Sequence, residues 1–343
     1  MTRERRVYLA RWTEVDKQAL ETAIAWCGHW AHIRSGARVL VKPNLTFPFH
    51  TPGVTTPPDM IRAVTELLLD HGAQVTIAEG GPSLDVYSGE NAFLEHGILA
   101  LAAEYGVRVA DLHTCPVKSM GFGRKPAGQN IPVTALLDET DVFISLPMVK
   151  VHCMTTVTLA LKNQWGIIPA KKRFLFHSAL PDILTGLNAL LPRPLVIADA
   201  RTVLDENGPM FGTPRPGNFL AVSNDPGAFD YAVSTLMGFD PHHIEHIRAG
   251  MRNGVVPRSL AEITLNADLL AYRPFVFHLR RTAQNYVALA GFKNRWIGKF
   301  GYDSAAASLL HRLLYAVKGN PLKRAMQDKY GAQYVEAGFK EPL

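Results

Sequence analysis

The 343-residue chain is poor in cysteine, with Cys27, Cys115 and Cys153 as its three cysteines. They form no C-x-x-C pair, so the sequence predicts neither a disulfide framework nor a cysteine-rich zinc or iron–sulfur site. The chain also lacks an apolar run long enough to span a bilayer, and its first residues lack the apolar core of a signal peptide. These absences favour a cytoplasmic protein without an iron–sulfur cluster.

Nucleotide-binding loops are missing as well. The chain contains neither a G-x-G-x-x-G pattern nor a Walker motif, and the pair Gly80-Gly81 alone is too weak a signal for a phosphate loop. What the sequence does have is an ordinary globular composition, 47% hydrophobic and 19% charged. Its length predicts one large domain or two lobes.

The net charge of +6 is unevenly distributed. Residues 271–343 hold 12 Lys and Arg against 4 Asp and Glu, whereas residues 1–270 hold 24 against 26. We therefore predict a core of residues 1–270 and a basic C-terminal extension of residues 271–343. The extension is either a solvated set of basic helices or a surface for an acidic partner, a membrane or an anionic ligand. Assembly of several copies is a further expectation.

Short apolar runs alternate with helical patterns through the first 270 residues. Such alternation predicts an α/β fold, a mostly parallel sheet with helices on both faces. Residues 116–132 and 204–218 are rich in Gly and Pro and predict loops. Helices are predicted for residues 155–166, 272–292 and 304–319. In the C-terminal extension we expect a set of apolar side chains to be buried: Phe275, Phe277, Leu279, Leu309, Leu313 and Leu314.

Polar residues recur where the apolar strands end. This group comprises Lys42, Asn44, Glu79, Lys150, His152 and Asp199. The carboxyl ends of parallel strands share one edge of a sheet, and ligands bind in the crevice there. A single charge at a strand end is commonly just the chain reaching water, but the repetition predicts that these side chains line one site.

Lys162 lies on the predicted helix 155–166, and Asn163 follows it. A lysine there either extends to the surface or faces the crevice, where crowding by Lys150 would lower its pKa. A lysine of that kind suits a general base, an oxyanion clamp or a covalent amine. His152 and His177 could move protons or bind a metal, although lone histidines are commonly structural.

Thr55 and Thr56 precede a predicted helix start, where hydroxyls cap the helix and an anion could also bind. We take Lys150, His152, Lys162 and His177 as candidate catalytic residues. The candidate substrate-binding residues are Lys42, Asn44, Thr55, Thr56 and Asn163. Glu79, Asp199 and His177 are the candidate metal ligands.

These motifs resemble the family named domain of unknown function 362. The resemblance covers roughly residues 38–268 and rests on the following segments: "VKPNL" (41–45), "TTPP" (55–58), "VKVH" (149–152), "TLALKNQWG" (158–166), His177, "NGPMFG" (207–212) and "NDPGAFD" (224–230). It implies no defined chemistry. Some members carry ferredoxin-like iron–sulfur cysteines, which this chain lacks.

The spacing of His152, Lys162 and His177, ten and then fifteen residues, is also similar to that in the nickel-pincer lactate racemase family. That similarity implies His152 as the acid/base residue, Lys162 as a covalent cofactor anchor and His177 as a metal ligand. The residues around the three positions differ.

Together these features predict an enzyme acting on a small anion, a carboxylate or a phosphate. Lys and His side chains would supply acid–base and oxyanion chemistry of an isomerase, epimerase or lyase type. Two alternatives stay open: an oxidoreductase or cofactor-dependent redox protein, and a non-catalytic binding or assembly protein that uses its basic C-terminal surface.

Overall fold

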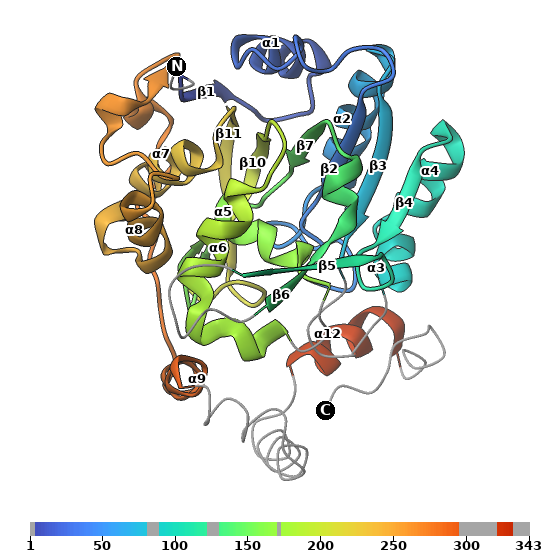
Figure 1. Ribbon diagram of the computed structural model, residues 1–343. Helices are drawn as coiled ribbons and strands as arrows, with labels where there is room; N and C mark the ends of the chain where they lie inside the picture. Colours follow the sequence, from blue (N-terminus) through green and yellow to red (C-terminus); the bar gives the residue numbers. More distant parts are fainter. Residues whose placement is uncertain (1–3, 81–88, 122–129, 170–172, 295–320, 332–343) are drawn as a thin grey trace.

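The computed structural model describes residues 4–80, 89–121, 130–169, 173–294 and 321–331 (Figure 1). A ten-stranded mixed sheet runs through its centre, with its main path in the order β12-β1-β11-β10-β7-β2-β3-β4. Its strands are β1 (Arg6–Arg11), β2 (Arg38–Lys42), β3 (Gln74–Glu79), β4 (Arg108–Asp111), β7 (Val142–Ser145), β8 (Lys150–His152), β9 (Thr156–Thr158), β10 (Leu195–Asp205), β11 (Thr213–Ser223) and β12 (Thr264–Leu265). Strands β10, β7, β2, β3 and β4 pair in parallel, while β11 is antiparallel to β1 and β10. The predicted α/β class with a mostly parallel sheet is confirmed.

Alternate residues of the central strands enter separate hydrophobic clusters, as the period of two in a strand requires. In β2, Val39 and Val41 pack on one face of the sheet and Leu40 packs on the other. Both faces are therefore apolar, which explains why these strands appear in the sequence as nearly continuous apolar runs.

Helices cover both faces (Figure 1). The first face carries α1 (Lys17–Trp26), α2 (Pro58–Asp70), α3 (Gly89–Glu95) and α4 (Ile98–Tyr105). The second carries α5 (Ala160–Asn163), α6 (Leu180–Ala189), α7 (Pro226–Met237) and α8 (Glu245–Arg252). The carboxylate of Asp225 accepts the N–H of Ala228 and caps α7, satisfying one of the free donors at the start of that helix.

Both predicted loops are wrong in part. Residues 116–132 contain β5 (Val117–Gly121) and most of β6 (Asn130–Thr134), which pair antiparallel. Residues 204–218 belong largely to the hairpin of β10 and β11. Only residues 219–223 of β11 have β1 on their other side, so Pro214 and Pro216 lie on an edge segment that tolerates a missing N–H.

The predicted helix over 155–166 is also corrected. Its first residues form β9, which pairs with β8 in a tight hairpin, and only then does α5 begin. The β-branched side chains of residues 155–158 favour a strand, and Thr156 adopts a positive φ of 68°. The helix that carries Lys162 is consequently a single turn, continued as a 3₁₀ turn over Gln164–Ile167.

The C-terminal extension departs from the predicted helix 272–292. Residues 274–282 form no helix, and α9 (Ala283–Lys293) begins after the Thr282 cap. Phe277 is buried in the hydrophobic cluster of α7, and Phe275 and Leu279 pack against it. The predicted helix 304–319, with Leu309, Leu313 and Leu314, lies outside the described residues.

A further helix, α12 (Pro321–Tyr330), follows in the described part of the extension. Met326 on this helix is fully buried, and Leu322 and Ala325 pack against Phe47 and Val54. The extension thus contacts the core, while the division at residue 270 stays a prediction. Of the helices among the described residues, none is long and apolar enough to cross a membrane.

Candidate active site

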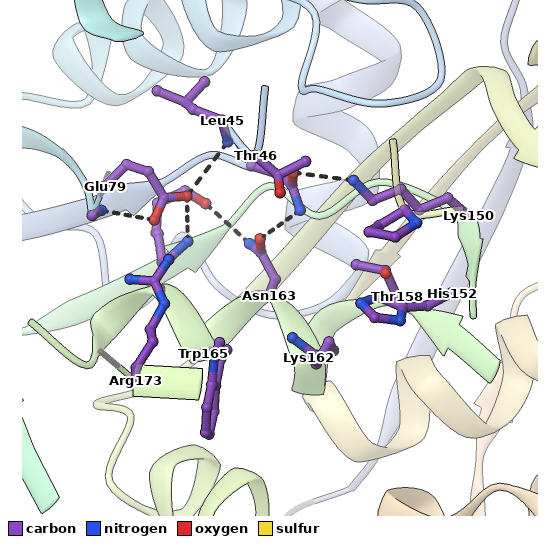
Figure 2. A pocket seen from close by; sticks show the side chains of 15 residues that line it. Leu45, Thr46, Glu79, Lys150, His152, Thr158, Lys162, Asn163, Trp165 and Arg173 are labelled. Carbon is purple, nitrogen blue, oxygen red and sulfur yellow. Dashed lines mark hydrogen bonds and ion pairs between the residues drawn. The ribbon is translucent and has the colours of Figure 1, made fainter. Parts of the chain in front are cut away.

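Strands β2, β3 and β8 bring charged residues to one cavity of about 100 Å³ at the carboxyl edge of the sheet (Figure 2). Lys42 ends β2, Glu79 ends β3, and Lys150 and His152 begin and end β8. Lys162 on α5 joins them. The cavity lining also includes Asn44, Leu45, Thr46, Gly80, Thr158, Asn163, Trp165, Gly166, Arg173 and Pro209. Of the strand-end residues expected at one crevice, all except Asp199 line this cavity, although they come from distant parts of the sequence.

A buried ion pair forms one side of the cavity. The Nζ of Lys42 lies 2.6 Å from Oε2 of Glu79, whose Oε1 accepts the N–H of Gly80 at 2.8 Å. Gly166 lies against this pair, and a Cβ at that position would overlap Oε1 of Glu79 and press on the Lys42 ammonium. Glycine at 166 is therefore what allows the ion pair and the turn after α5 to approach each other.

Lys150 is held by a chain of hydrogen bonds within the protein. Its Nζ donates to the backbone oxygen of Val54 at 2.6 Å and to Oδ1 of Asn44 at 3.3 Å. Asn44 donates to Oδ1 of Asn163 at 3.1 Å, and Asn163 donates to Oγ of Ser145 at 3.0 Å. Burial, and next the charge of Lys162, lowers the pKa of Lys150 well below its usual range. The network fixes the amine in place and leaves its charge weakly compensated.

Lys162 stands out because its ammonium is not compensated. Among the described residues its Nζ makes no hydrogen bond or ion pair, and its recorded contact is with the Trp165 ring, 5.5 Å from the centroid. Burial, followed by the charges of Arg173 and Lys42, lowers the pKa of Lys162 to about 7. At neutral pH this lysine is thus divided between a charged form that binds anions and a neutral amine that accepts protons.

Asp230 positions the short helix that carries Lys162. It is fully buried in α7, and Oδ1 accepts the N–H of Ala160 at 2.7 Å while Oδ2 accepts that of Leu161 at 3.2 Å. Those two donors lie in the first turn of α5. A carboxylate from a helix distant in sequence therefore caps α5. Asp230 ends the family segment "NDPGAFD", which was the signal in the sequence that this residue has a role.

His152 is held with its ring in a defined orientation. Its Nδ1 accepts the backbone N–H of Met154 at 3.1 Å and that of Thr155 at 3.4 Å. Nδ1 must then be unprotonated, so the neutral ring carries its proton on Nε2. Burial, and next the charge of Lys162, lowers the pKa of His152 well below its usual range. The residue is consequently a neutral hydrogen-bond donor at physiological pH.

Arg173 is a site residue that sequence reasoning missed. It is buried, lines the cavity, and contributes to the lowered pKa of Lys162 through its positive charge. It ends the basic run of residues 171–173, and nothing in that run of like residues indicates that Arg173 lines a cavity.

Thr55 and Thr56 are used within the protein. The Thr56 hydroxyl donates to the backbone oxygen of Leu146 at 2.7 Å and accepts the N–H of Asn44 at 2.8 Å. The Thr55 hydroxyl accepts the N–H of Thr51 at 3.0 Å. Neither belongs to the described lining of the cavity, and their contacts hold the loop that presents Asn44.

Asp199 does not join the other strand-end residues. Strand β10 continues beyond it to Asp205, so Asp199 is not at a strand end. Its neighbours Ala198 and Ala200 pack on the α7 face, which turns Asp199 to the opposite face. There it binds Arg201, which also binds Asp59 at the start of α2.

His177 lies outside the cavity that contains Lys162. Its ring meets Trp165 edge-on, with centroids 5.1 Å apart, and it lines a second cavity instead. Across the described residues, no three His, Cys, Asp or Glu side chains gather closely enough to hold a metal ion. The predicted set of Glu79, Asp199 and His177 is thus dispersed. Of these three candidate ligands, Glu79 alone lines the cavity beside Lys162 among the described residues.

The chain is similar to one curated protein and, more distantly, to two solved structures. A thylakoid-associated protein of Synechocystis is 28% identical over 245 residues, 68% of this chain and 72% of that protein. The lactate racemase apoprotein of Thermoanaerobacterium thermosaccharolyticum is 12% identical with a TM-score of 0.37, covering 58% of this chain and 51% of its own. A Thermotoga maritima protein is 12% identical with a TM-score of 0.42, covering 71% and 60%. This chain spans only about half to three fifths of those two solved chains, and so distant a likeness supports no argument about function.

The sequence profile of the family described as domain of unknown function (DUF362) matches residues 39–235. This span begins within β2 and ends within α7. It therefore includes every described residue that lines the cavity at the carboxyl edge. Since the profile covers more than half of the chain, the protein belongs to the DUF362 family.

Proposed function

We propose that this protein is an enzyme that binds a small carboxylate or phosphate and moves a proton on the carbon next to the anionic group, as an isomerase or a lyase does. The observation that carries the proposal is Lys162, whose enclosed amine has a pKa lowered to about 7 by burial and by Arg173 and Lys42. A base with a pKa near the working pH is the most effective at proton transfer.

The cavity lining supports an anionic substrate. Lys42, Lys150, Lys162 and Arg173 all contribute to the wall, and Glu79 is the carboxylate among the described lining residues. Glu79 pairs with Lys42. Lys162 has no hydrogen bond or ion pair among the described residues, so the charged form of Lys162 can bind an anion in this largely buried site, where electrostatic interactions are strong.

His152 supports a division of roles within the site. Because two backbone N–H groups occupy Nδ1, the ring offers Nε2–H to a substrate oxygen and is poorly suited to accept a proton. A neutral imidazole donor can stabilise the charge that develops on a carboxylate oxygen. The base is then Lys162, and His152 is the electrophile.

In the proposed step the neutral Nζ of Lys162 takes the proton from the carbon beside the substrate carboxylate. The C–H electron pair moves into the bond to the carboxyl carbon, and negative charge gathers on a carboxylate oxygen. The Nε2–H of His152 and the neighbouring lysine cations stabilise that oxygen. Return of the proton to the same carbon gives an isomer, whereas loss of a group from the next carbon gives a lyase product.

Proton exchange tests the proposal without knowledge of the product. The protein is incubated in D₂O with short hydroxy, amino and phospho carboxylates, and proton NMR follows loss of the signal beside the carboxylate. We expect exchange with at least one compound, and its abolition in Lys162→Met. The matched control is Lys17→Met, because Lys17 lies exposed on α1 and pairs with Glu66. Absence of exchange across the panel, or full exchange in Lys162→Met, would contradict the proposal.

The same experiment separates the alternative functions. A non-catalytic binding protein would bind the anions without exchange, and a redox protein would need an added electron acceptor. A metal ion or covalent cofactor at Lys162 stays a prediction, which intact-mass and metal analysis of the purified protein can test.

We further propose that residues 271–343 contact an acidic partner or an anionic membrane surface. The excess of 12 basic over 4 acidic residues in 271–343 supports contact with an acidic partner or an anionic membrane surface, as does the name of the thylakoid-associated relative. Location in the cytoplasm and assembly into homo-oligomers stay predictions. Sedimentation with anionic and neutral vesicles tests the membrane contact, which we expect to weaken as salt is raised.

A further inference from the structure

A second and larger cavity, of about 620 Å³, lies where the C-terminal extension meets the core. The turn between β8 and β9, α6, α8 and α9 all contribute residues to its wall. Its volume falls in the range typical of small-molecule sites. The activity proposed above uses none of its side chains, and His177, the candidate that the first cavity leaves out, lies in its lining.

The lining combines an apolar wall with basic groups. Met154, Leu180 and Leu289 supply apolar surface, while Arg281 and Lys293 supply cations. Glu245 is the carboxylate in this lining, and it lies 3.9 Å from Lys293. After that pairing, one positive charge remains beside apolar surface, which is the complement of a molecule with an apolar body and one acidic group.

His246 gives independent evidence that the cavity is a binding site. It is 2% exposed and lines the cavity, and among the described residues neither of its ring nitrogens has a hydrogen-bond partner. Oδ2 of Asp230 lies 3.9 Å from its Nε2, beyond hydrogen-bond distance. A buried imidazole without partners costs free energy unless a ligand or water satisfies it.

The wall of this cavity also positions both principal residues of the first site. Met154 and Thr155 lie in the lining, and their N–H groups hold Nδ1 of His152. His246 lies beside Asp230, which caps the helix that carries Lys162. A ligand that moved the turn or His246 would therefore act on the geometry of His152 and Lys162.

We propose that this second cavity binds a small amphipathic anion, with an apolar body and one acidic group, and that its binding adjusts the first site. The acidic group lies toward Arg281 and His246, and the apolar body lies against Met154, Leu180 and Leu289. This site is separate from the one that holds the substrate and goes beyond the proposed function.

Decanoate is the probe, with acetate as the probe that lacks the apolar body. Calorimetry on the full chain should show one decanoate per protein, and acetate should bind more than tenfold more weakly, since each buried CH₂ contributes about 0.8 kcal/mol. Ala290→Trp fills the cavity from α9 and should weaken decanoate binding at least tenfold. Ala283→Trp is the matched control, an exposed alanine of the same helix outside the described lining, and should bind normally.

A charge-reversal variant and amide NMR test the same proposal independently of Ala290→Trp. Lys293→Glu adds a carboxylate to the wall and should also weaken binding, even if Ala290→Trp fails to fold. Amide NMR should show decanoate shifting the signals of Met154 and Thr155 in the wild type. Normal binding by folded Ala290→Trp or Lys293→Glu would overturn the proposal. So would loss of decanoate binding in Lys162→Met, because the probe would then occupy the first cavity.

Discussion

Two groups of charges, each partly buried, lie on either side of the same sheet, and their charges are paired differently. Arg201 donates to Asp199 at 2.8 Å and to both oxygens of Asp59 at 2.8 and 2.7 Å, so one planar cation is shared by two carboxylates. Lys162 is enclosed beside Arg173 and Lys42, and its Nζ has no hydrogen bond or ion pair among the described residues. The charge of Arg201 is paired, whereas that of Lys162 has no pair among the described residues.

The difference separates charges that hold the fold from charges that are available to a ligand. A guanidinium between two carboxylates has its charge and its N–H groups matched, so removing it leaves carboxylates unpaired. An uncompensated ammonium costs stability, and its neutral form is favoured. Lys162 should therefore be dispensable for folding and essential for chemistry, while Arg201 should show the reverse.

The largest effect is expected for Lys162→Met. Loss of the amine should lower the rate of proton exchange by about 10²–10⁴-fold, the contribution typical of a general base. The unfolding free energy should rise by about 1–2 kcal/mol at neutral pH, because the alkyl stem remains and the desolvated charge is gone.

The sign of the accompanying pH dependence follows from linkage. The pKa of Lys162 is lowered to about 7 by burial, below its unfolded value, so the unfolded chain binds the extra proton between the two values. Stability of the wild type gains from this group as pH rises above 7, and Lys162→Met lacks that gain. Thermal melts across this pH range measure it, and equal slopes for both proteins would contradict the account.

Arg201→Met should have the opposite effects: it should lower the stability of the fold and leave anion binding unchanged. The Asp199 carboxylate is fully buried and would lose its cation, whereas Asp59 is exposed enough to regain water. We expect a loss of about 2–3 kcal/mol in the unfolding free energy, below the full cost of breaking a buried pair. Denaturant unfolding measures this loss, and anion binding at the first cavity should be unchanged in the folded variant. A variant as stable as the wild type would show that the comparison is wrong.

Gly166→Ala tests the packing around the ion pair of Lys42 and Glu79 in the first cavity. The added methyl would overlap Glu79 and press on Lys42, so the ion pair must shift. We expect a cost of about 1–2 kcal/mol from overpacking and a weaker affinity for sulfate at the cavity. Gly97→Ala is a suitable control, since nothing lies within 4 Å of a Cβ there, although its positive φ of 72° carries its own modest strain. Equal sulfate affinity in Gly166→Ala and the wild type would count against the assigned packing.

The smallest effect is the pH dependence of sulfate binding, chosen because sulfate keeps its charge over the neutral range. Below pH 7 Lys162 is charged and the affinity should be constant. Above pH 7 the affinity should fall by up to tenfold per unit, because a proton must be taken up on binding. Calorimetry in buffers of different ionisation enthalpy counts that proton. A flat profile in the wild type would exclude Lys162 as the titrating group.

The sequence predicted the parts of this site that depend on local pattern. Apolar runs ending in Lys42, Glu79 and Lys150 identified the carboxyl edge of the sheet, and five of the six expected side chains meet there. Asp199 was misplaced because the strand continues past it, and the hairpin with β11 depends on pairing between distant residues. Apolar patterning alone does not determine where such a strand ends.

Other site residues depend on contacts that no local pattern contains. Asp230 reaches the start of α5 from a helix 70 residues away in sequence, and Arg173 turns inward from a basic run whose members look alike. The roles of the candidate residues in catalysis and binding stay predictions, since the structure gives their positions and surroundings.

The most direct test of the central claim is the pKa of Lys162 itself. NMR of protein labelled with ¹³C-lysine follows the ε-CH₂ shifts against pH, and Lys162→Met identifies the signal by its disappearance. The account predicts that this signal titrates at about pH 7, well below the ordinary lysine value, owing to burial and the charges of Arg173 and Lys42. Titration of the Lys162 signal at the ordinary value, near 10.4, would contradict it.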